Sequence, residues 1–452
     1  EERSKNIKNG DLATMIYTSG TTGNPKGVML SHNNILSNVL ACEPRIPGDH
    51  NSSSLSFLPV CHVYERMLHY LYMKIGCSIH FAESMDTIGD NIREVQPEIF
   101  TAVPRLIEKV YEKIYNKGLE LSGAKKSLFF WALGLTDDYE YDKQFSGLAG
   151  LKMKIADKLI FSKWREALGG NVRGILTGAA PCPVKMAKVF SAAGIPIREG
   201  YGLTETSPGL AIGRYKPQGA MLGAIGPALK SVELRLDPTG GEYGDGEGEI
   251  LAKGPNIMMG YYKKPEATAE VFREIDGERW FCTGDVGKFV KGPSGEDFLQ
   301  ITDRKKELLK TSGGKYVAPA PIENKLKEDF LVEQVMVVGE QRKFVSAVIL
   351  PAEEALKDWC TQHDIPWNGM ADAIENPKVI AKYQSIIDRY NPLFSKIEQI
   401  KKFCLLPTSW EPVRNDGTAA ELTPTMKLKR RVIREKYGQQ IDKLYAEERA
   451  SV

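Results

Sequence analysis

Short apolar runs alternate with amphipathic segments along roughly the first 200 residues. The apolar run at 98–104 is followed by a helical pattern at 105–115, and the run at 171–178 by a helical pattern at 183–193. A further apolar run follows at 195–202. Strands that alternate with helices predict a mostly parallel α/β sheet, whose ligands are expected at the carboxyl ends of its strands.

The beginning of the chain fits the same order. Residues 11–17 predict a short buried strand and residues 28–40 the helix after it, with a loop rich in Gly, Ser and Thr between them. The segment 119–150 mixes aromatic with charged residues and interrupts the alternation. We expect it to be an insertion or a helical excursion.

The pattern changes at about residue 223. Short β patterns with Gly-rich turns recur at 231–236, 246–254, 286–292 and 297–302, which predicts an antiparallel subdomain resembling a small β-barrel.

A third pattern follows residue 303, with a helix at 319–328 and strands at 332–339 and 344–350. We therefore expect an α/β protein with a large N-terminal domain over 1–302, β-rich from 223 onward, and a small α+β domain over 303–452.

Composition narrows the class of protein. The chain has 452 residues, of which 42% are hydrophobic and 26% charged, as in globular proteins. Its 60 Lys and Arg against 58 Asp and Glu give a net charge of +2, so bulk charge gives no reason to expect a nucleic-acid partner. Seven cysteines without a CxxC pair disfavour a disulfide framework or a zinc site and fit a reducing, cytoplasmic location. The sequence contains no apolar run of about 18 residues, so no membrane span is predicted. The first residues are charged and do not form a signal peptide.

The loop at 17–27 has the composition of a phosphate-binding loop. It reads YTSGTTGNPKG, with three glycines, several hydroxyl groups and Lys26. Small residues let backbone N–H groups approach a phosphate, and hydroxyl and ammonium groups add donors and charge. The Walker A pattern is absent, and a flexible surface turn is the competing reading.

The longer stretch TSGTTGNPKGVMLSH resembles the phosphate-loop signature of the adenylate-forming superfamily, which includes acyl-CoA synthetases, luciferases and peptide-synthetase adenylation domains. The resemblance implies that this loop holds the β- and γ-phosphates of ATP. The residues it assigns to the nucleotide here are Thr18, Ser19, Gly20, Thr21, Thr22, Gly23 and Lys26.

Three further segments resemble the family's nucleotide motifs in the same order. They are TGAAP at 177–181, EGYGLTET at 199–206 and WFCTGDVG at 280–287. By this resemblance Tyr201 stacks on adenine, Thr204 contacts phosphate and Glu205 helps to hold Mg²⁺. Asp285 would accept hydrogen bonds from the ribose hydroxyls. The other nucleotide-site residues implied are Gly178, Ala179, Ala180, Glu199, Gly200 and Gly202.

Two segments of the C-terminal part also resemble family motifs. ITDRKKELLKTSGGKYVAP at 301–319 resembles the hinge motif, with Arg304 contacting ribose and either Asp303 or Lys306 as the pivot. LTPTMKLKRRVI at 422–433 resembles the motif of the mobile catalytic lysine.

Alignment of the latter motif assigns Lys427 as that lysine, with Lys429 as the competing candidate. Met426 replaces the usual Gly, as is common in long-chain synthetases. The weaker match FLPVCHVYER at 57–66 would place His62 beside the acyl carboxylate, although a lone His is more often structural.

Together these motifs imply a long-chain fatty acid–CoA ligase that uses ATP and Mg²⁺. The carboxylate attacks the α-phosphate to give acyl-AMP and pyrophosphate, and the CoA thiol then displaces AMP after the C-terminal domain rotates.

An acyl-AMP ligase that loads a carrier protein is the alternative enzyme. Because family members carry a substantial region before the first loop, an inactive truncated fragment is the third reading. A fatty substrate suggests peripheral membrane contact through the aromatic segment 127–135, which could equally belong to the core. Chain-length preference, CoA-binding residues and oligomeric state stay open.

Overall fold

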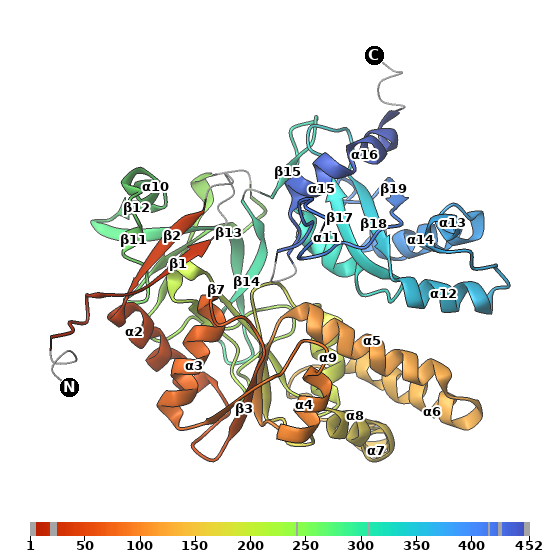
Figure 1. The fold of residues 1–452 in the computed structure, drawn as a ribbon, viewed down its shortest axis with the longest axis horizontal. Coiled ribbons are helices and arrows are strands. Elements are labelled where there is room, and N and C mark those ends of the chain that lie inside the picture. The colour runs from red at the N-terminus through yellow and green to blue at the C-terminus, as the bar shows by residue number, and fades with distance from the viewer. Residues whose placement is uncertain are drawn as a thin grey trace. The chain divides into compact units, whose positions relative to one another are not determined.

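The computed structural model describes residues 6–18, 25–240, 243–305, 307–414, 416–423 and 427–446. The chain divides into two compact units, 1–301 and 302–452, which are described separately below. Figure 1 shows the order of the elements in each unit.

A six-stranded sheet forms the centre of the first unit, with strand order β4-β3-β5-β6-β7-β8. All neighbours in this sheet are parallel except β7 and β8. This arrangement confirms the predicted α/β class with a mostly parallel sheet. The strands are β3 (Ser53–Ser56), β4 (Ser78–Phe81), β5 (Ile99–Ala102), β6 (Gly174–Thr177), β7 (Ile197–Gly202) and β8 (Gly209–Ile212).

Helices cover both faces of this sheet. Successive strand residues point to opposite sides, so each face presents apolar side chains against which helices pack. Ile99 packs in one hydrophobic cluster with α2 and α3, whereas the next residue, Phe100, packs in a second cluster with α4, α5 and α9. These helices are α2 (His32–Cys42), α3 (Val63–Ile75), α4 (Ile88–Val95), α5 (Pro104–Glu120) and α9 (Val184–Ala192).

The beginning of the chain differs from the prediction. Residues 12–18 (β1, Leu12–Thr18) pair antiparallel with β2 (Lys26–Ser31), so the Gly-rich loop connects two strands of a hairpin. The predicted helix over 28–40 is therefore wrong in its first four residues. Val28 and Leu30 are fully buried on one side of β2, and the side chain of Ser31 caps α2 by accepting a hydrogen bond from the Asn34 N–H at 3.1 Å. A two-residue strand, β11 (Gly260–Tyr261), pairs with the other edge of β2.

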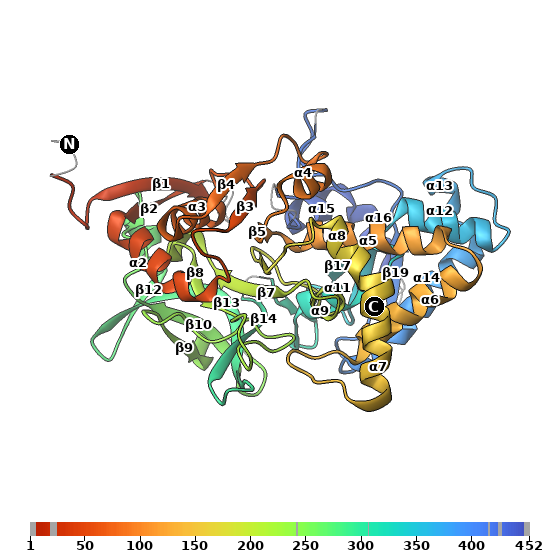
Figure 2. The ribbon, with the colours of Figure 1, turned by 90° about the horizontal axis from the view of Figure 1, so that it is seen from below.

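The segment after α5 is helical, as one of the two readings of 119–150 predicted. It contains α6 (Gly123–Gly134), a 3₁₀ turn (Leu135–Asp138), α7 (Gly147–Ala156), a π turn (Asp157–Phe161) and α8 (Ser162–Ala167). Phe129 and Ala132 of the segment 127–135 are buried in the helical core, where the Phe129 and Trp164 rings lie 5.9 Å apart. Figures 1 and 2 show α5 to α8 gathered at one end of the six-stranded sheet.

The β-rich part of the first unit is an open antiparallel sheet, and its described strands do not close into a barrel. The strand order is β12-β13-β10-β9, and β14 also pairs with β13. The strands are β9 (Glu233–Asp237), β10 (Gly248–Lys253), β12 (Phe272–Ile275), β13 (Glu278–Lys291) and β14 (Asp297–Arg304), with α10 (Pro265–Glu270) before β12.

The second unit is built on the sheet β17-β18-β19, in which β17 and β18 are antiparallel and β18 and β19 parallel. Tyr383 is fully buried on one side of this sheet and Tyr445 is 1% exposed in a second cluster. The strands are β15 (Leu309–Lys310), β16 (Tyr316–Val317), β17 (Val332–Val338), β18 (Ser346–Pro351) and β19 (Lys402–Leu405). The helices are α11 (Pro319–Leu326), α12 (Glu353–Gln362), α13 (Met370–Ala373), α14 (Pro377–Tyr390), α15 (Arg430–Lys436) and α16 (Gly438–Leu444). Among the described residues of both units, no helix combines the length and the apolar character that crossing a bilayer requires.

Candidate active site

Two of the predicted nucleotide motifs meet through their side chains. The hydroxyl of Tyr201, on β7, donates a hydrogen bond of 2.8 Å to Oδ2 of Asp285, on β13. Tyr201 is half-buried and Asp285 is 6% exposed. The structure thus brings the residue predicted to stack on adenine next to the residue predicted to bind ribose.

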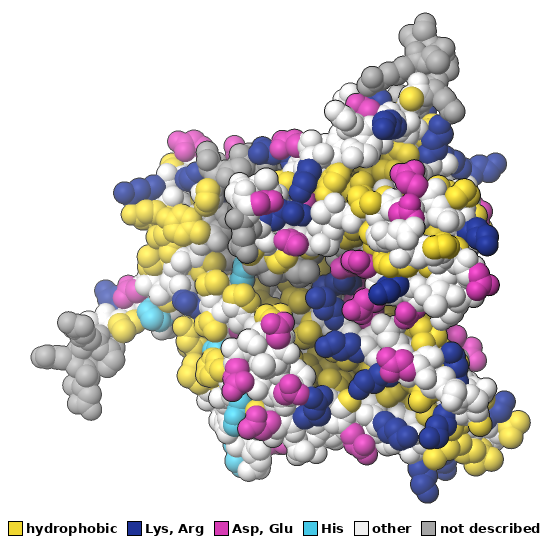
Figure 3. Space-filling model, turned by 45° about the vertical axis from the view of Figure 1, so that its right-hand side comes forward, with side chains coloured by type: hydrophobic (Ala, Val, Ile, Leu, Met, Phe, Trp, Pro, Cys, Tyr) yellow, Lys and Arg dark blue, Asp and Glu magenta, His cyan; other side chains and the backbone are white. Residues whose placement is uncertain are grey.

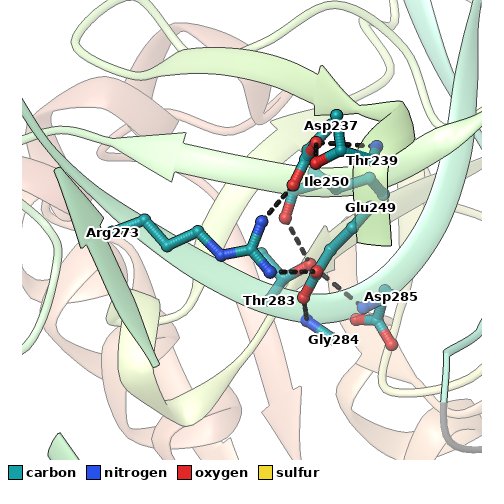
Figure 4. A network of polar contacts seen from close by, with 8 residues as sticks. All are labelled: Asp237, Thr239, Glu249, Ile250, Arg273, Thr283, Gly284 and Asp285. Atoms are coloured by element: carbon teal, nitrogen blue, oxygen red, sulfur yellow. Dashed lines mark hydrogen bonds and ion pairs between the residues drawn. The ribbon is translucent and has the colours of Figure 1, made fainter. Parts of the chain in front are cut away.

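The turn that carries Asp285 is held by a polar network behind it (Figure 4). Two extra residues on β13 form a bulge between the Leu251–Cys282 and Glu249–Val286 pairs. Gly284 lies in this bulge at φ +73°, a conformation that favours glycine, and its N–H donates to Glu249 Oε1 at 3.2 Å.

Thr283 fixes the other side of the turn. Its hydroxyl donates to the Ile250 carbonyl at 2.8 Å and accepts from the Asp285 N–H at 3.1 Å. Arg273 pairs with Asp237 and lies 3.7 Å from Glu249 Oε2, so the buried Glu249 carboxylate has a cationic neighbour. These contacts fix the backbone of the turn and thereby the position of the Asp285 side chain.

The predicted adenine-side loop and β7 are joined by a carboxylate. Glu199 accepts a hydrogen bond from the Cys182 N–H at 3.2 Å, and burial raises the pKa of Glu199 to about 7. In the loop, Ala179 has φ +68°, an uncommon backbone conformation for a residue with a side chain. Gly178 lies against the Tyr64 ring and the Gly200 carbonyl, where a Cβ would come within 3.2 Å of both. Ala180 follows at the half-buried end of the loop.

The end of β7 turns sharply into a 3₁₀ turn, Thr204–Thr206. A Cβ on Gly202 would lie 1.7 Å from the Pro208 carbonyl oxygen, so no larger residue fits. The turn presents Thr204 and Glu205 as half-buried side chains directly after Tyr201. It therefore supplies a hydroxyl and a carboxylate three and four residues after Tyr201 in the chain.

Tyr261 joins Glu205 to the first motif. Its hydroxyl donates to Glu205 Oε1 at 2.8 Å, and the Nζ of Lys26 lies 4.9 Å from the centre of its ring. Burial and the neighbouring Glu205 charge raise the pKa of Tyr261, so its hydroxyl stays a donor. β11 fixes Tyr261 opposite Val28 of β2.

The donor set at this place fits Mg²⁺. The described residues contain no group of three or more His, Cys, Asp or Glu side chains that could hold a metal ion. Mg²⁺ is commonly bound by one or two carboxylates together with water and substrate phosphates. Glu205, with Thr204 before it in the same turn, would be such a set. Tyr261 holds Glu205 through Oε1.

The remaining predicted residues of the first unit belong to the segment from β1 to β2 and to the start of α3. Thr18 and Lys26 are opposite each other at the end of the β1–β2 hairpin. Ser19, Gly20, Thr21, Thr22 and Gly23 fall outside the described residues. His62 is half-buried and directly precedes α3, where Tyr64 donates to the Leu176 carbonyl at 3.0 Å.

The predicted hinge residues belong to the second unit. Asp303 is 3% exposed and accepts from the Arg304 N–H at 2.5 Å. Burial raises its pKa to about 7, and the nearby Glu323 and Glu307 charges add to this effect. Arg304 is exposed and lies 3.8 Å from Glu307. Lys306 lies outside the described residues.

Lys427 is exposed and contacts Thr423 of the same unit. Its N–H donates to the Thr423 hydroxyl at 3.0 Å, and the Thr423 N–H donates to its carbonyl at 2.8 Å. Lys429 is half-buried and its N–H donates to the Glu421 carbonyl at 2.7 Å. Met426 lies outside the described residues.

Arg430 connects the lysine loop to the hinge segment. It donates to Glu307 Oε2 at 3.0 Å and forms two hydrogen bonds of 2.7 Å with Glu323. Arg430 therefore links the start of α15 to the residues that follow Arg304.

Comparison with known proteins identifies the family. The model of the AMP-binding enzyme family matches residues 1–262, and that of the AMP-binding enzyme C-terminal domain matches residues 306–449. The chain belongs to the AMP-binding enzyme family. This confirms the predicted adenylate-forming superfamily.

Curated relatives confirm the predicted likeness to long-chain synthetases. The chain is 32% identical to the long-chain-fatty-acid–CoA ligase FadD15 of Mycobacterium bovis, over 98% of this chain and 70% of that protein. It is 34% identical to long-chain-fatty-acid–CoA ligase 1 of Homo sapiens, over 96% of this chain and 61% of that protein.

Solved structures agree in fold. The adenylation domain of a carboxylate reductase from Mycobacterium chelonae superposes with a TM-score of 0.69 at 25% identity, over 97% of this chain and 61% of that chain. The chain thus has the mixed α/β fold of the adenylation domains of this family.

Three positions of this AMP-binding enzyme were missed by reasoning from the sequence: Tyr261, Glu249 and Arg273. Tyr261 lies in GYYKKPEAT, between the predicted β segments 246–254 and 286–292, and Glu249 is one of two acidic residues in GEGEI. The only local signal for these contacts was Glu249, an acidic residue within an apolar strand pattern. Such a residue is equally compatible with an exposed position on a strand. Their contacts span 56 residues for Tyr261 and Glu205 and 35 for Gly284 and Glu249.

Proposed function

We propose that the protein is a long-chain fatty acid–CoA ligase that forms acyl-CoA, AMP and pyrophosphate from a fatty acid, ATP and CoA. The observation that carries the proposal is the hydrogen bond between Tyr201 and Asp285. It joins an aromatic face suited to a purine with a carboxylate suited to a vicinal diol. The relatives named long-chain-fatty-acid–CoA ligases support the substrate class.

In the first half-reaction a carboxylate oxygen of the acid forms a bond to the α-phosphorus of ATP. The bond from this phosphorus to the α–β bridging oxygen breaks, and pyrophosphate leaves. Lys26 and the hairpin loop would hold the leaving phosphates, while Tyr201, Glu199 and the 178–180 loop hold the adenosine. Bound to Glu205, Mg²⁺ supplies neutralisation of phosphate charge.

The protein's own contribution to this step is position and charge. Tyr261 fixes the Glu205 carboxylate from behind and faces the Lys26 ammonium. Fixed groups need no reorganisation when charge develops in the transition state. Lys427 would add a positive charge at the reacting carboxylate and α-phosphate, and His62 would lie beside the acyl carboxylate.

In the second half-reaction the CoA sulfur forms a bond to the acyl carbonyl carbon, and the bond from that carbon to the AMP oxygen breaks. The thiol proton passes to solvent, and AMP leaves with the oxygen. We propose that the C-terminal domain, 303–452, rotates about Asp303 or Lys306 between the two steps, so that Lys427 serves only the first.

A carrier protein is the alternative acyl acceptor. It is favoured by the structural likeness to a didomain of a carboxylic acid reductase from Segniliparus rugosus, described as A-PCP and in complex with AMP, with a TM-score of 0.70 at 25% identity. The relatives named CoA ligases cover the chain equally well at higher identity, so CoA is the acceptor we propose.

The deciding experiment is ATP–pyrophosphate exchange with fatty acids of increasing chain length, followed by thioester formation with CoA or with an acyl carrier protein. Exchange that depends on a long-chain acid, and a thioester with CoA alone, are expected. A thioester with the carrier protein alone would identify the alternative enzyme. ATP binding without exchange on any acid would mean that these 452 residues are an inactive fragment.

A further inference from the structure

The helical segment 147–167 has an exposed apolar stripe. Its four members are large aliphatic side chains with relative exposures of 70%, 55%, 41% and 43%: Leu148, Leu151, Ile155 and Leu159. Their spacing of three or four residues places them on one side of the helix. Ala156, Phe161 and Trp164 are buried in the core on the opposite side.

The stripe is more than a chance exposure of single residues. Scattered apolar side chains are normal on protein surfaces, but a contiguous row usually marks a contact site. The other aromatic segment considered for membrane contact, 127–135, contributes Phe129 and Ala132 to the core. Within this helical part of the unit, the exposed apolar surface is therefore on α7 and the turn after it.

Positive charge flanks the stripe on both sides. At 3.6 residues per turn, Lys152 lies on one side of the stripe and Lys154 and Lys158 lie on the other. These three lysines and Lys163 are exposed. Of the two acidic residues between 147 and 167, Asp157 is paired with Arg165 at 2.6 Å. Figure 3 shows hydrophobic side chains beside Lys and Arg side chains at the lower right, the end of the first unit where α6 and α7 lie in Figure 1.

We propose that α7 docks the protein on an anionic lipid surface, with the stripe in the boundary between headgroups and acyl chains. An apolar stripe flanked by lysines is the pattern of helices that lie in this interface. The lysine stems extend along apolar surface while their ammonium groups reach the lipid phosphates. This inference goes beyond the proposed ligase activity and does not depend on it.

Charge argues against a second copy of the chain as the occupant. Two copies joined through this stripe would bring Lys152, Lys154 and Lys158 of one chain close to those of the other, and like charges disfavour such an interface. Four side chains on a ten-residue helix and the turn after it also offer much less area than the roughly 800 Å² per partner of a stable interface. An anionic bilayer matches both the charge and the shape of the stripe.

The test is flotation of the 452-residue chain with vesicles of phosphatidylcholine containing 30% phosphatidylglycerol, against vesicles of phosphatidylcholine alone. Binding to the anionic vesicles that weakens at high salt is expected. The double substitution Leu151→Ser with Ile155→Ser should lower the partition coefficient by about tenfold or more. Lys154→Gln with Lys158→Gln should lower it by about fivefold per lysine.

Matched controls lie in the other unit. Leu393→Ser removes a side chain that is 62% exposed, and Lys357→Gln removes an exposed lysine. Neither should change vesicle binding, and thermal unfolding should show that all variants stay folded. Absence of binding, or equal binding by the stripe variants, would overturn the proposal. A sedimentation coefficient that indicates a dimer, lost in the Leu151→Ser and Ile155→Ser variant, would assign the stripe to a second copy and also overturn it.

The outcome can be separated from that of the ligase proposal. ATP–pyrophosphate exchange without vesicles does not involve the stripe, so its variants should exchange at the rate of the unmodified chain. Failure of vesicle binding leaves the ligase proposal untouched, and failure of exchange leaves the membrane proposal untouched.

Discussion

The hydroxyl of Tyr201 donates a hydrogen bond to Asp285 across 84 residues of the chain, at 2.8 Å. β7 of the parallel sheet carries the first residue, and a bulge of β13 in the antiparallel sheet carries the second. Neither sheet alone contains both an aromatic face and a fixed carboxylate at this place. The nucleotide site that we propose therefore depends on how these two sheets are packed.

Asp285→Ala should weaken ATP binding by about 10- to 100-fold, because charged hydrogen bonds to the two ribose hydroxyls are lost. Calorimetric titration with ATP and with 2′-deoxy-ATP checks both the loss and its cause. The unmodified chain should prefer ATP, and the variant should bind both nucleotides alike. If the variant keeps the preference for ATP, Asp285 does not bind the ribose.

Tyr201→Phe keeps the ring and removes only the hydrogen bond to Asp285. ATP affinity should fall by about fivefold, corresponding to about 1 kcal/mol for one such bond. Tyr201→Ala should lose more, since the aromatic face is also removed. Equal affinities for the Phe and Ala variants would mean that the ring does not contact adenine.

Lys427→Ala should slow acyl-AMP formation by about 100-fold, because a positive charge at the reacting phosphate is removed. Thioester formation from supplied acyl-AMP should keep its rate. Single-turnover assays of each half-reaction provide the measurement, and Lys429→Ala is the matched control. Loss of adenylation in the Lys429 variant, with the Lys427 variant unaffected, would exchange the two assignments.

Tyr261→Phe should raise the Mg²⁺ concentration needed for half-maximal adenylation by roughly tenfold, because Glu205 loses the hydrogen bond that fixes it. The phenyl ring still faces Lys26, so binding of ATP without Mg²⁺ should stay the same. Titration of Mg²⁺ in both assays tests this split. Tyr262→Phe is the control, since Tyr262 is 40% exposed. An equal change in ATP binding without Mg²⁺ would show that the effect is on Lys26 instead.

Asp303 should make stability depend on pH. Its pKa is about 7 in the folded protein, mainly through burial, and its ordinary value is 3.8. Between these values the folded state binds the proton more strongly than the unfolded state. The contribution of Asp303 to the free energy of unfolding is therefore full below about pH 4 and is lost as pH rises through 7.

Asp303→Asn replaces the ionisable carboxyl with a neutral amide. At pH 8 the variant should unfold with a free energy roughly 1–3 kcal/mol higher than that of the unmodified chain, because no buried charge forms in its second unit. At pH 4.5 the two chains should differ little. Urea unfolding at the two pH values provides the measurement. Glu199, whose pKa is also about 7, stays unchanged in both chains and cancels in the comparison. A difference between the chains that does not vary with pH would contradict the burial of an ionisable carboxyl at this position.

Most of the fold class could be predicted from local pattern. The apolar runs at 98–104, 171–178 and 195–202 became β5, β6 and β7, because short β-rich runs bounded by helices have few alternatives in an α/β protein. β3, β4 and β8 were not predicted. Two of them contain serine or glycine at buried positions, Ser54 and Gly209, which weakens an apolar pattern.

The hairpin at the first motif shows why local pattern was insufficient elsewhere. The spacing of apolar residues in VMLSHNNIL suits a helix as well as a strand that continues into one. Its first part became β2 because it lies between β1 and β11, which supply backbone hydrogen bonds on both sides. The partner on the second side, β11, is distant in sequence, so local pattern could not predict it.

By itself, the sequence was enough to identify the family and to predict residues that contact the nucleotide, because these are short runs whose chemistry is set by residue type and order. Only the tertiary structure decided which groups hold them in place. Tyr261 at Glu205, Glu249 at Gly284 and Tyr201 at Asp285 are hydrogen bonds between segments 35 to 84 residues apart. The exposed stripe on α7 was decided in the same way, since helix periodicity gives two apolar faces there and packing of the core buries only one.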